Sequence, residues 1–208
     1  IGRVADDRDH LAETALLSGK PEPTSLAYAM AKLAGVQMCL AYNQQDGEQR
    51  FIPIIPNSAY GPGDNFDLAS GHVLASLVCR FVDAQAENAP TVTLWGSGRP
   101  RREFVFADDI ADACLRLLTE DVSSLELPVN LGNGIDYSIA ELAETIAGLT
   151  GYSGEIVWDS DKPDGAPQKL LDSSRLRNWG WQPVTRLEDG LRLTIEWYRQ
   201  NSAKENTP

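Results

Sequence analysis

The sequence predicts an α/β fold with a mainly parallel β-sheet. Segments with apolar residues at helical spacing alternate along the chain with short apolar runs that suit buried strands. Alternating helices and strands are typical of parallel sheets, because each helix returns the chain to the sheet between two strands. The chain has 208 residues, 42% of them apolar and 23% charged, so it is long enough to bury a substantial core.

The first predicted elements are a helix, a strand and a loop. Residues 24–42 combine helix-forming residues with a broad apolar surface and predict a helix. The apolar run 51–56 predicts a buried strand, although Pro53 disfavours a central place in a sheet. Residues 60–65 contain two glycines and a proline, which predict a loop.

The middle of the chain continues the alternation. Residues 71–87 predict a helix, since apolar residues recur there at steps of three and four. Residues 91–95 predict a strand that ends in the turn 96–98. Asp108 can cap the N-terminus of a third helix, and residues 129–132 predict a further short strand.

The last third of the chain begins with a clear helix start. Ser138 and Glu141 have the spacing of a capping box, and the helix that they open is expected to end near Gly151. Residues 155–159 predict a strand, and residues 187–198 predict the last helix. No predicted strand is followed by the glycine-rich turn that opens a helix in dinucleotide-binding folds, so the pyrophosphate-binding turn of such a fold is missing.

The composition disfavours several classes of protein. Acidic residues outnumber basic ones by 30 to 18, and the net charge of −12 argues against binding to nucleic acid or anionic membranes. Cys39, Cys79 and Cys114 form no disulfide or metal motif, and no apolar run is long enough to span a membrane. We therefore expect a cytoplasmic protein without a metal. The chain starts at Ile1 and its first methionine is Met30, which indicates a processed or truncated chain, or part of a longer protein.

Tyr28 and Lys32 form the first candidate site. Residues four apart on a helix are neighbours on its surface. An ammonium group close to a phenol favours the phenolate, and this moves the phenol toward the pKa that a general acid or base needs at neutral pH. The alternative is an exposed tyrosine and an exposed lysine on an ordinary helix, because the spacing also arises by chance.

Four segments stand in a specific order and spacing: ETALLSGKPEPTSLAYAMAKLAGVQMCLAY, YGPGDNFDLASGHVLASLVCRF, WGSGRPRREFVFADDIADA and KPDGAPQKLLD. They resemble the GDP-L-fucose synthase family of epimerase-reductases, in the extended short-chain dehydrogenase/reductase superfamily, over roughly residues 13–198. The resemblance implies the C-terminal part of a Rossmann-type fold with a smaller α/β substrate-binding domain, without the N-terminal glycine-fingerprint half. Residues 1–62 would be what remains of the NADP-binding domain. Residues 63–208 would be mainly the sugar-nucleotide domain, with elements that return to the cofactor domain.

The resemblance also implies a two-step reaction. The family inverts C3 and C5 of GDP-4-keto-6-deoxy-D-mannose and then reduces C4 with NADPH. Tyr28 would donate the proton during reduction, while Lys32 would tune the phenol and hold the nicotinamide ribose. His72 would be the acid and base of epimerisation, for which an imidazole is suited at neutral pH. The alternative for His72 is a structural hydrogen bond at the start of a helix.

Further site residues follow from the same resemblance. Guanidinium groups suit a diphosphate, which gives a role to local basic residues in an acidic chain. Trp95 could stack on a sugar or simply pack, and Lys169 is a weaker candidate. The substrate-binding residues would be Arg80, Trp95, Arg102 and Asp164, and the cofactor-binding residues Lys32, Pro56, Asn57, Ser58, Ala59 and His72.

Three departures from the family pattern leave other functions open. The glycine-fingerprint half of the cofactor domain is absent before Ile1, which motivates a non-catalytic alternative. The strand that carries the family's catalytic serine and second epimerisation residue, a cysteine, is absent. The family usually has proline-threonine-asparagine-leucine where this chain has residues 56–59, Pro-Asn-Ser-Ala. The alternatives are a related NAD(P)-dependent nucleotide-sugar epimerase or reductase with another substrate, and a non-catalytic chain that binds a sugar nucleotide. The family also pairs through the helix of Tyr28, which implies a homodimer. The apolar surface around Met30, Leu33, Ala34 and Leu40 could serve that role or face the sheet.

Overall fold

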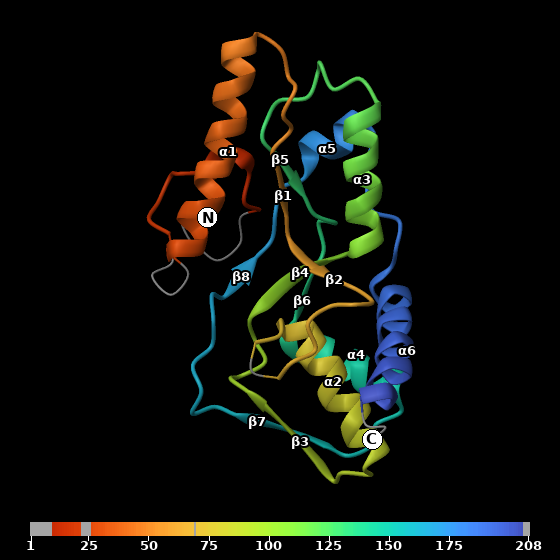
Figure 1. Cartoon of the computed structure of the whole chain (residues 1–208). Coiled ribbons are helices and arrows are strands. Elements are labelled where there is room, and N and C mark those ends of the chain that lie inside the picture. The colour runs from red at the N-terminus through yellow and green to blue at the C-terminus, as the bar shows by residue number, and fades with distance from the viewer. Residues whose placement is uncertain (1–9, 22–25, 69, 206–208) are drawn as a thin grey trace.

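The computed structural model describes residues 10–21, 26–68 and 70–205, and these form an α/β fold whose strand pairs are mainly parallel (Figure 1). The predicted fold class is confirmed. From α1 to α5, two strands separate each helix from the next, so the chain returns repeatedly from helix to strand as the apolar pattern indicates. The helical segments are η1 (Glu13–Ala15), α1 (Leu26–Asp46), α2 (Val73–Ala86), α3 (Ala107–Thr119), α4 (Ile139–Thr150), α5 (Ser174–Trp179) and α6 (Leu187–Glu205).

The strands form three small sheets. One parallel pair joins β1 to β5 and another joins β3 to β7. In the third sheet β4 is central: it pairs in parallel with β2 and β8 and antiparallel with β6. The bounds are β1 (Ile54–Pro56), β2 (Ser58–Tyr60), β3 (Thr91–Trp95), β4 (Arg101–Phe106), β5 (Val129–Leu131), β6 (Asp136–Ser138), β7 (Glu155–Asp159) and β8 (Gln168–Lys169).

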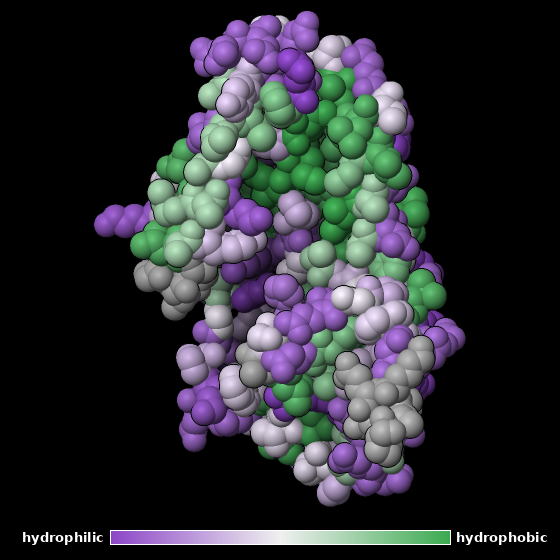
Figure 2. Space-filling view, viewed as in Figure 1, coloured by the Kyte–Doolittle hydropathy of each residue, from purple (hydrophilic) through white to green (hydrophobic). Residues whose placement is uncertain are grey.

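Two hydrophobic clusters lie on either side of β4. Because successive side chains of a strand point to opposite faces, Phe104 and Phe106 enter one cluster and Val105 enters the other. The first cluster includes residues of α2, α4 and α6, which pack on one another in the lower half of Figure 1. The second includes residues of α3, α5 and β5 in the upper half. Figure 2 shows apolar side chains at the surface of that upper half, between α1 and α3.

Several local predictions are confirmed. Strands occupy 91–95 and 155–159, as predicted. The predicted buried strand 51–56 is only partly right, because β1 covers 54–56, has no fully buried residue and begins just after Pro53. The capping box is present, because the Ser138 hydroxyl accepts from the Glu141 N–H at 3.1 Å and the Ser138 N–H donates to the Glu141 carboxylate at 2.7 Å. Gly151 ends α4 in the left-handed conformation, with φ 78°.

Other local predictions are wrong. The periodicity of the sequence does not indicate β4, since the strand opens with three charged residues, and it does not indicate the short strands β2, β6 and β8. Asp108 does not cap α3: β4 runs directly into this helix, so Phe106 takes the N-cap position and Asp108 lies in the first turn. The predicted loop begins at Gly61 rather than Tyr60, because Tyr60 belongs to β2 and is buried.

Gly190 provides a stability prediction. Helix α6 crosses β2 and β4 so closely that a Cβ at Gly190 would overlap the Tyr60 hydroxyl and lie 2.9 Å from the Phe106 ring. Overpacking of this kind costs typically about 1–3 kcal/mol. We expect Gly190→Ala to lower the free energy of unfolding by about that amount in a urea titration. Gly148→Ala, in α4 with open space around it, should be neutral or stabilising. Equal effects of the two substitutions would contradict the close packing.

Candidate active site

Tyr28 and Lys32 lie together on the exposed surface of α1. Ala29 and Leu33 are the buried residues of this helix, while the Tyr28 side chain is 65% exposed. The Lys32 Nζ atom lies 5.6 Å from the centroid of the Tyr28 ring, as the four-residue spacing predicts. The N-terminal end of α1 points toward the half of the molecule that contains α2 (Figure 1). The pair is therefore open to a ligand that approaches from that side.

His72 occupies the N-cap position of α2. Its side chain is 81% exposed, and it makes no capping hydrogen bond to the helix. The His72 side chain therefore does not cap the helix. The closest ionisable partner is Asp64, whose Oδ1 atom lies 3.8 Å from the His72 Nδ1 atom. Asp64 Oδ2 is buried without a hydrogen-bond partner among the described residues. The family pattern did not single out Asp64, although it stands in the glycine-rich loop that the sequence predicts.

Three of the four substrate-binding candidates line one cleft of about 190 Å³. Trp95 ends β3, Arg102 lies in β4 and Asp164 follows β7, so the fold brings together residues that are far apart in the sequence. Val73, next to His72, also lines the cleft. The other lining residues are Gly98, Pro100, Ile139, Pro163 and Gly165.

Two of the residues that line this cleft, Asp164 and Trp95, contact other side chains of the protein. Ser97 donates to Asp164 twice, from its N–H to Oδ1 at 2.8 Å and from its hydroxyl to Oδ2 at 2.6 Å. The Ser97 side-chain hydrogen bond, followed by the one from its backbone, lowers the pKa of Asp164. The Trp95 side chain is 69% exposed, and Lys162 Nζ lies 5.5 Å from the centroid of its ring. Sequence reasoning missed Ser97 and Lys162, since only the fold brings them to these partners.

Arg80 and Lys169 lie outside the set of residues that line the cleft. Arg80 is on α2 and donates from Nε to the Ser76 hydroxyl at 3.4 Å. Lys169 is in β8, in register with Arg102 on the neighbouring strand β4. The structure thus brings three substrate-binding candidates together, while Arg80 and Lys169 do not line the same cleft.

The predicted cofactor stretch runs from the end of β1 into β2. Pro56 ends β1, Ser58 and Ala59 lie in β2, and Asn57 joins the two strands. The Asn57 side chain is engaged within the protein: it donates to the Glu103 carboxylate and accepts from the Ser58 N–H at 2.9 Å. Glu103, which sequence reasoning also missed, is completely buried.

The described residues fit one end of a dinucleotide. Exposed Tyr28 and Lys32 could contact a nicotinamide and its ribose. Within the described ranges, none of the glycine turns after β2, β3 and β5 opens directly onto a helix, which is the arrangement that holds a pyrophosphate. The fit is therefore to the reactive end of the cofactor.

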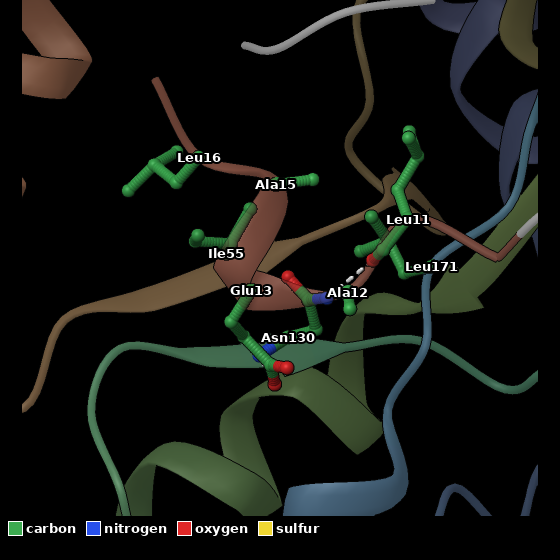
Figure 3. A pocket seen from close by; sticks show the side chains of 8 residues that line it. All are labelled: Leu11, Ala12, Glu13, Ala15, Leu16, Ile55, Asn130 and Leu171. Atoms are coloured by element: carbon green, nitrogen blue, oxygen red, sulfur yellow. Dashed lines mark hydrogen bonds between the residues drawn. The ribbon is translucent and has the colours of Figure 1, made fainter. Parts of the chain in front are cut away.

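Two other cavities contain none of the predicted site residues. One, of about 70 Å³, lies between η1 and β5 (Figure 3). Its buried Glu13 accepts from the Asn130 N–H at 2.8 Å, and the Asn130 amide donates to the Leu11 carbonyl at 2.7 Å. These bonds attach the segment before α1 to β5. A larger cleft of about 370 Å³ lies beside the start of α6 and is lined by Arg177 and Arg186 among others.

Among the helices of the described ranges, none has the length and apolar character needed to cross a membrane. In the same ranges no group of three or more His, Cys, Asp or Glu side chains is arranged to hold a metal ion.

Comparison with known proteins points to one family. The chain is 48% identical over 191 residues to the putative GDP-L-fucose synthase 2 of Arabidopsis thaliana, covering 92% of this chain and 57% of that protein. It is 43% identical over 198 residues to the GDP-L-fucose synthase of Escherichia coli (strain K12), covering 92% of this chain and 61% of that protein. The chain thus spans about three fifths of the length of these relatives.

Solved structures agree with the sequence relatives. A GDP-L-fucose synthetase from Naegleria fowleri superposes with a TM-score of 0.83 at 29% identity, over 95% of this chain and 62% of that one. A GDP-6-OMe-4-keto-L-xylo-heptose reductase from C. jejuni also gives 0.83, at 31% identity, over 94% of this chain and 66% of that one. The family model for NAD dependent epimerases and dehydratases matches residues 2–132, more than half of the chain. The chain belongs to the NAD dependent epimerase/dehydratase family.

Proposed function

We propose that the chain is part of an NADPH-dependent epimerase-reductase that converts GDP-4-keto-6-deoxy-D-mannose to GDP-L-fucose. The observation that carries the proposal is the cleft that collects Trp95, Arg102 and Asp164 beside the start of α2. These are three of the residues to which the family resemblance assigns substrate binding. The names of the relatives, GDP-L-fucose synthases at 43–48% identity, support the same substrate.

The chemistry of the cleft suits a sugar diphosphate. The Arg102 guanidinium can bind phosphate oxygens, and Trp95 offers an exposed aromatic face at the mouth. Asp164 keeps lone pairs free beyond the two that Ser97 uses, so it can accept hydrogen bonds from sugar hydroxyls. Lys162 adds a second positive charge over Trp95. Arg102 and Lys162 place local positive charge at this cleft, which would let a protein of net charge −12 bind an anion there.

The proton transfers fall to two separate groups. His72, at the N-terminus of α2, would remove and return the protons on C3 and C5, which are acidic because they flank the C4 ketone. Its exposed imidazole and the nearby Asp64 are consistent with that role. Tyr28, with Lys32 beside its ring, would then protonate the oxygen at C4. A bound NADPH would supply the hydride for this second step.

A second candidate is a related GDP-sugar reductase with a different substrate. The stretch Asn57-Ser58-Ala59 departs from the family pattern at the place where the cofactor is expected. The C. jejuni heptose reductase and the GDP-L-colitose synthase of Yersinia pseudotuberculosis, which is 34% identical to this chain, show that neighbouring proteins differ in the sugar named for them. A non-catalytic chain that binds a sugar nucleotide is the third possibility.

Product analysis separates these candidates. The complete protein, with any residues that precede Ile1, would be incubated with GDP-4-keto-6-deoxy-D-mannose and NADPH. The proposal predicts NADPH oxidation and GDP-L-fucose, identified by NMR. Reduction without inversion at C3 and C5 would favour the second candidate. Substrate binding without NADPH oxidation would favour the third.

We also propose the domain arrangement, a homodimer and a cytoplasmic location. Residues 1–62 would belong to the cofactor domain, whose remaining part could cover the apolar surface between α1 and α3. On α1, exposed apolar side chains recur every four or eight residues at Leu26, Met30, Met38 and Tyr42, which provides a stripe for pairing two copies. Sedimentation at micromolar concentration should give the mass of two chains, and the mass of one chain would contradict the homodimer.

A further inference from the structure

The Glu103 carboxylate is the most completely enclosed acidic group near the cleft. It lies in the middle of β4, is 0% exposed, and accepts hydrogen bonds from three separate segments. The donors are the Asn57 side chain, the Gly134 N–H at 2.6 Å and the Leu171 N–H at 3.0 Å. The space around it is full, since a Cβ at Gly132 would lie 2.8 Å from the carboxyl carbon.

These three donors come from the elements that flank the candidate site. Asn57 joins β1 to β2, where the family resemblance expects the cofactor. Leu171 follows β8, the strand that pairs with β4 at Arg102. Gly134 lies in the turn between β5 and β6. One buried carboxylate thus connects the cofactor side of the site with the wall that carries Arg102.

We propose that Glu103 is a positioning residue that holds the Asn57 turn and the Arg102 strand in a fixed relation. The inference rests on the function proposed above and adds to it a residue that does not itself contact the ligands. Glu103 acts through Asn57 on the cofactor side and through Leu171 and β8 on the substrate side. A carboxylate suits this place because all of its oxygen lone pairs are acceptors, and three N–H donors converge on it.

The principal variant is Glu103→Gln, which keeps the size of the side chain. A glutamine has one acceptor oxygen and one NH2 group, so at least one of the three N–H donors loses its acceptor. NADPH affinity would be measured by fluorescence titration of the complete protein, and GDP affinity by calorimetry of the 208-residue chain. Oε2 accepts from Asn57 and Leu171 and Oε1 from Gly134, so in either orientation the glutamine NH2 group faces an N–H donor in a filled site and the side chain must shift. We therefore expect both dissociation constants to rise by about tenfold.

Asp109→Asn is the matched control. Asp109 is also a buried carboxylate with three donors, since it accepts from the Val184 N–H and from the N–H and hydroxyl of Thr185. Neither Val184 nor Thr185 lines the cleft of Trp95, Arg102 and Asp164; both line the separate cleft beside the start of α6. Asp109→Asn should lower the melting temperature but leave both dissociation constants within about twofold. If Glu103→Gln also lowered the melting temperature and left both dissociation constants within about twofold, Glu103 would have only a structural role. That result would overturn the inference.

Two further variants test the connection to Asn57. Asn57→Ala removes one donor while Glu103 keeps the other two, so NADPH affinity should fall and GDP affinity should stay. In the double variant with Glu103→Gln and Asn57→Asp, the glutamine NH2 group donates to the new carboxylate at position 57, which reverses the wild-type hydrogen bond. This should restore most of the NADPH affinity without restoring GDP affinity. Unchanged NADPH affinity in Asn57→Ala, or no recovery in the double variant, would contradict the inference even if Glu103→Gln alone fails to fold.

The wild-type measurements distinguish the inference from the function on which it rests. If the wild-type protein binds neither GDP nor NADPH, the proposed function fails and the inference fails with it. If the wild-type protein binds both and Glu103→Gln binds them equally well, only the inference is overturned.

Discussion

Tyr28→Phe is expected to stop reduction while leaving proton exchange intact. The substitution removes the hydroxyl that would protonate the oxygen at C4, but it keeps the ring and leaves His72 unchanged on α2. Loss of a general acid typically slows a step by roughly 10²- to 10⁴-fold. NADPH oxidation by the complete protein should fall by that factor. Exchange of the C3 and C5 protons with deuterium oxide, followed by NMR, should persist because it needs only enolisation beside the ketone.

His72→Gln is the reciprocal variant. It replaces an imidazole by an amide, which cannot act as a general acid or base near neutral pH. Tyr28 and Lys32 keep their geometry. Deuterium incorporation should be suppressed, and reduction of whatever ketone is bound should continue. If Tyr28→Phe abolished exchange and His72→Gln preserved it, the two roles would be assigned the wrong way round. No change in either variant would favour an exposed tyrosine, lysine and histidine without catalytic roles.

Arg102→Ala is expected to have the second largest effect. Hydrogen bonds that involve charged groups contribute about 1.5–3 kcal/mol, so loss of the guanidinium should weaken GDP binding by about 10- to 100-fold. The cleft should otherwise persist, because Trp95 and Asp164 come from other elements. Calorimetric titration of the 208-residue chain with GDP measures the change.

Arg99→Ala is the control for Arg102→Ala. It removes the same charge three residues before Arg102, just outside β4, but Arg99 is exposed and does not belong to the residues that line the cleft. GDP affinity should therefore change by less than about threefold, as expected for a solvent-screened charge. If both substitutions weakened binding equally, general attraction of an anion would explain the result better than a specific contact.

The local elements show how far the sequence determines the fold. Periodic apolar residues and the Ser138–Glu141 capping box indicate α1, α2, α3, α4 and α6, because these signals lie within a few residues of each other. The short segments η1 and α5 carry no such signal and are not predicted. Strand β4 was missed because it begins with Arg101, Arg102 and Glu103. Its charges are accommodated by partners elsewhere in the fold: Arg101 pairs with Asp136 at 2.8 Å, and Glu103 accepts from three other segments.

In the candidate site, too, local spacing predicts some contacts, while contacts between distant segments are not predicted. The Tyr28–Lys32 neighbourhood follows from a spacing of four residues on one helix. The contacts that shape the cleft join distant positions, such as Ser97 to Asp164 and Trp95 to Lys162, and no local pattern contains them. The family resemblance indicated Trp95, Arg102 and Asp164. Only the folded chain shows that they share one cleft and that Arg80 lies outside it.

The tryptophan indole resonances provide the most direct test of the central claim, that the cleft binds the GDP part of the substrate. Trp95 lines the cleft, whereas the indoles of Trp179 and Trp181 donate elsewhere, to the Asp121 carbonyl at 2.9 Å and the Asp112 carboxylate at 2.8 Å. In NMR spectra of the 208-residue chain, with the Trp95 signal assigned from Trp95→Phe, added GDP should shift the Trp95 indole resonance and leave those of Trp179 and Trp181 in place. A saturable shift of the Trp179 or Trp181 signal, with Trp95 unmoved, would contradict the claim.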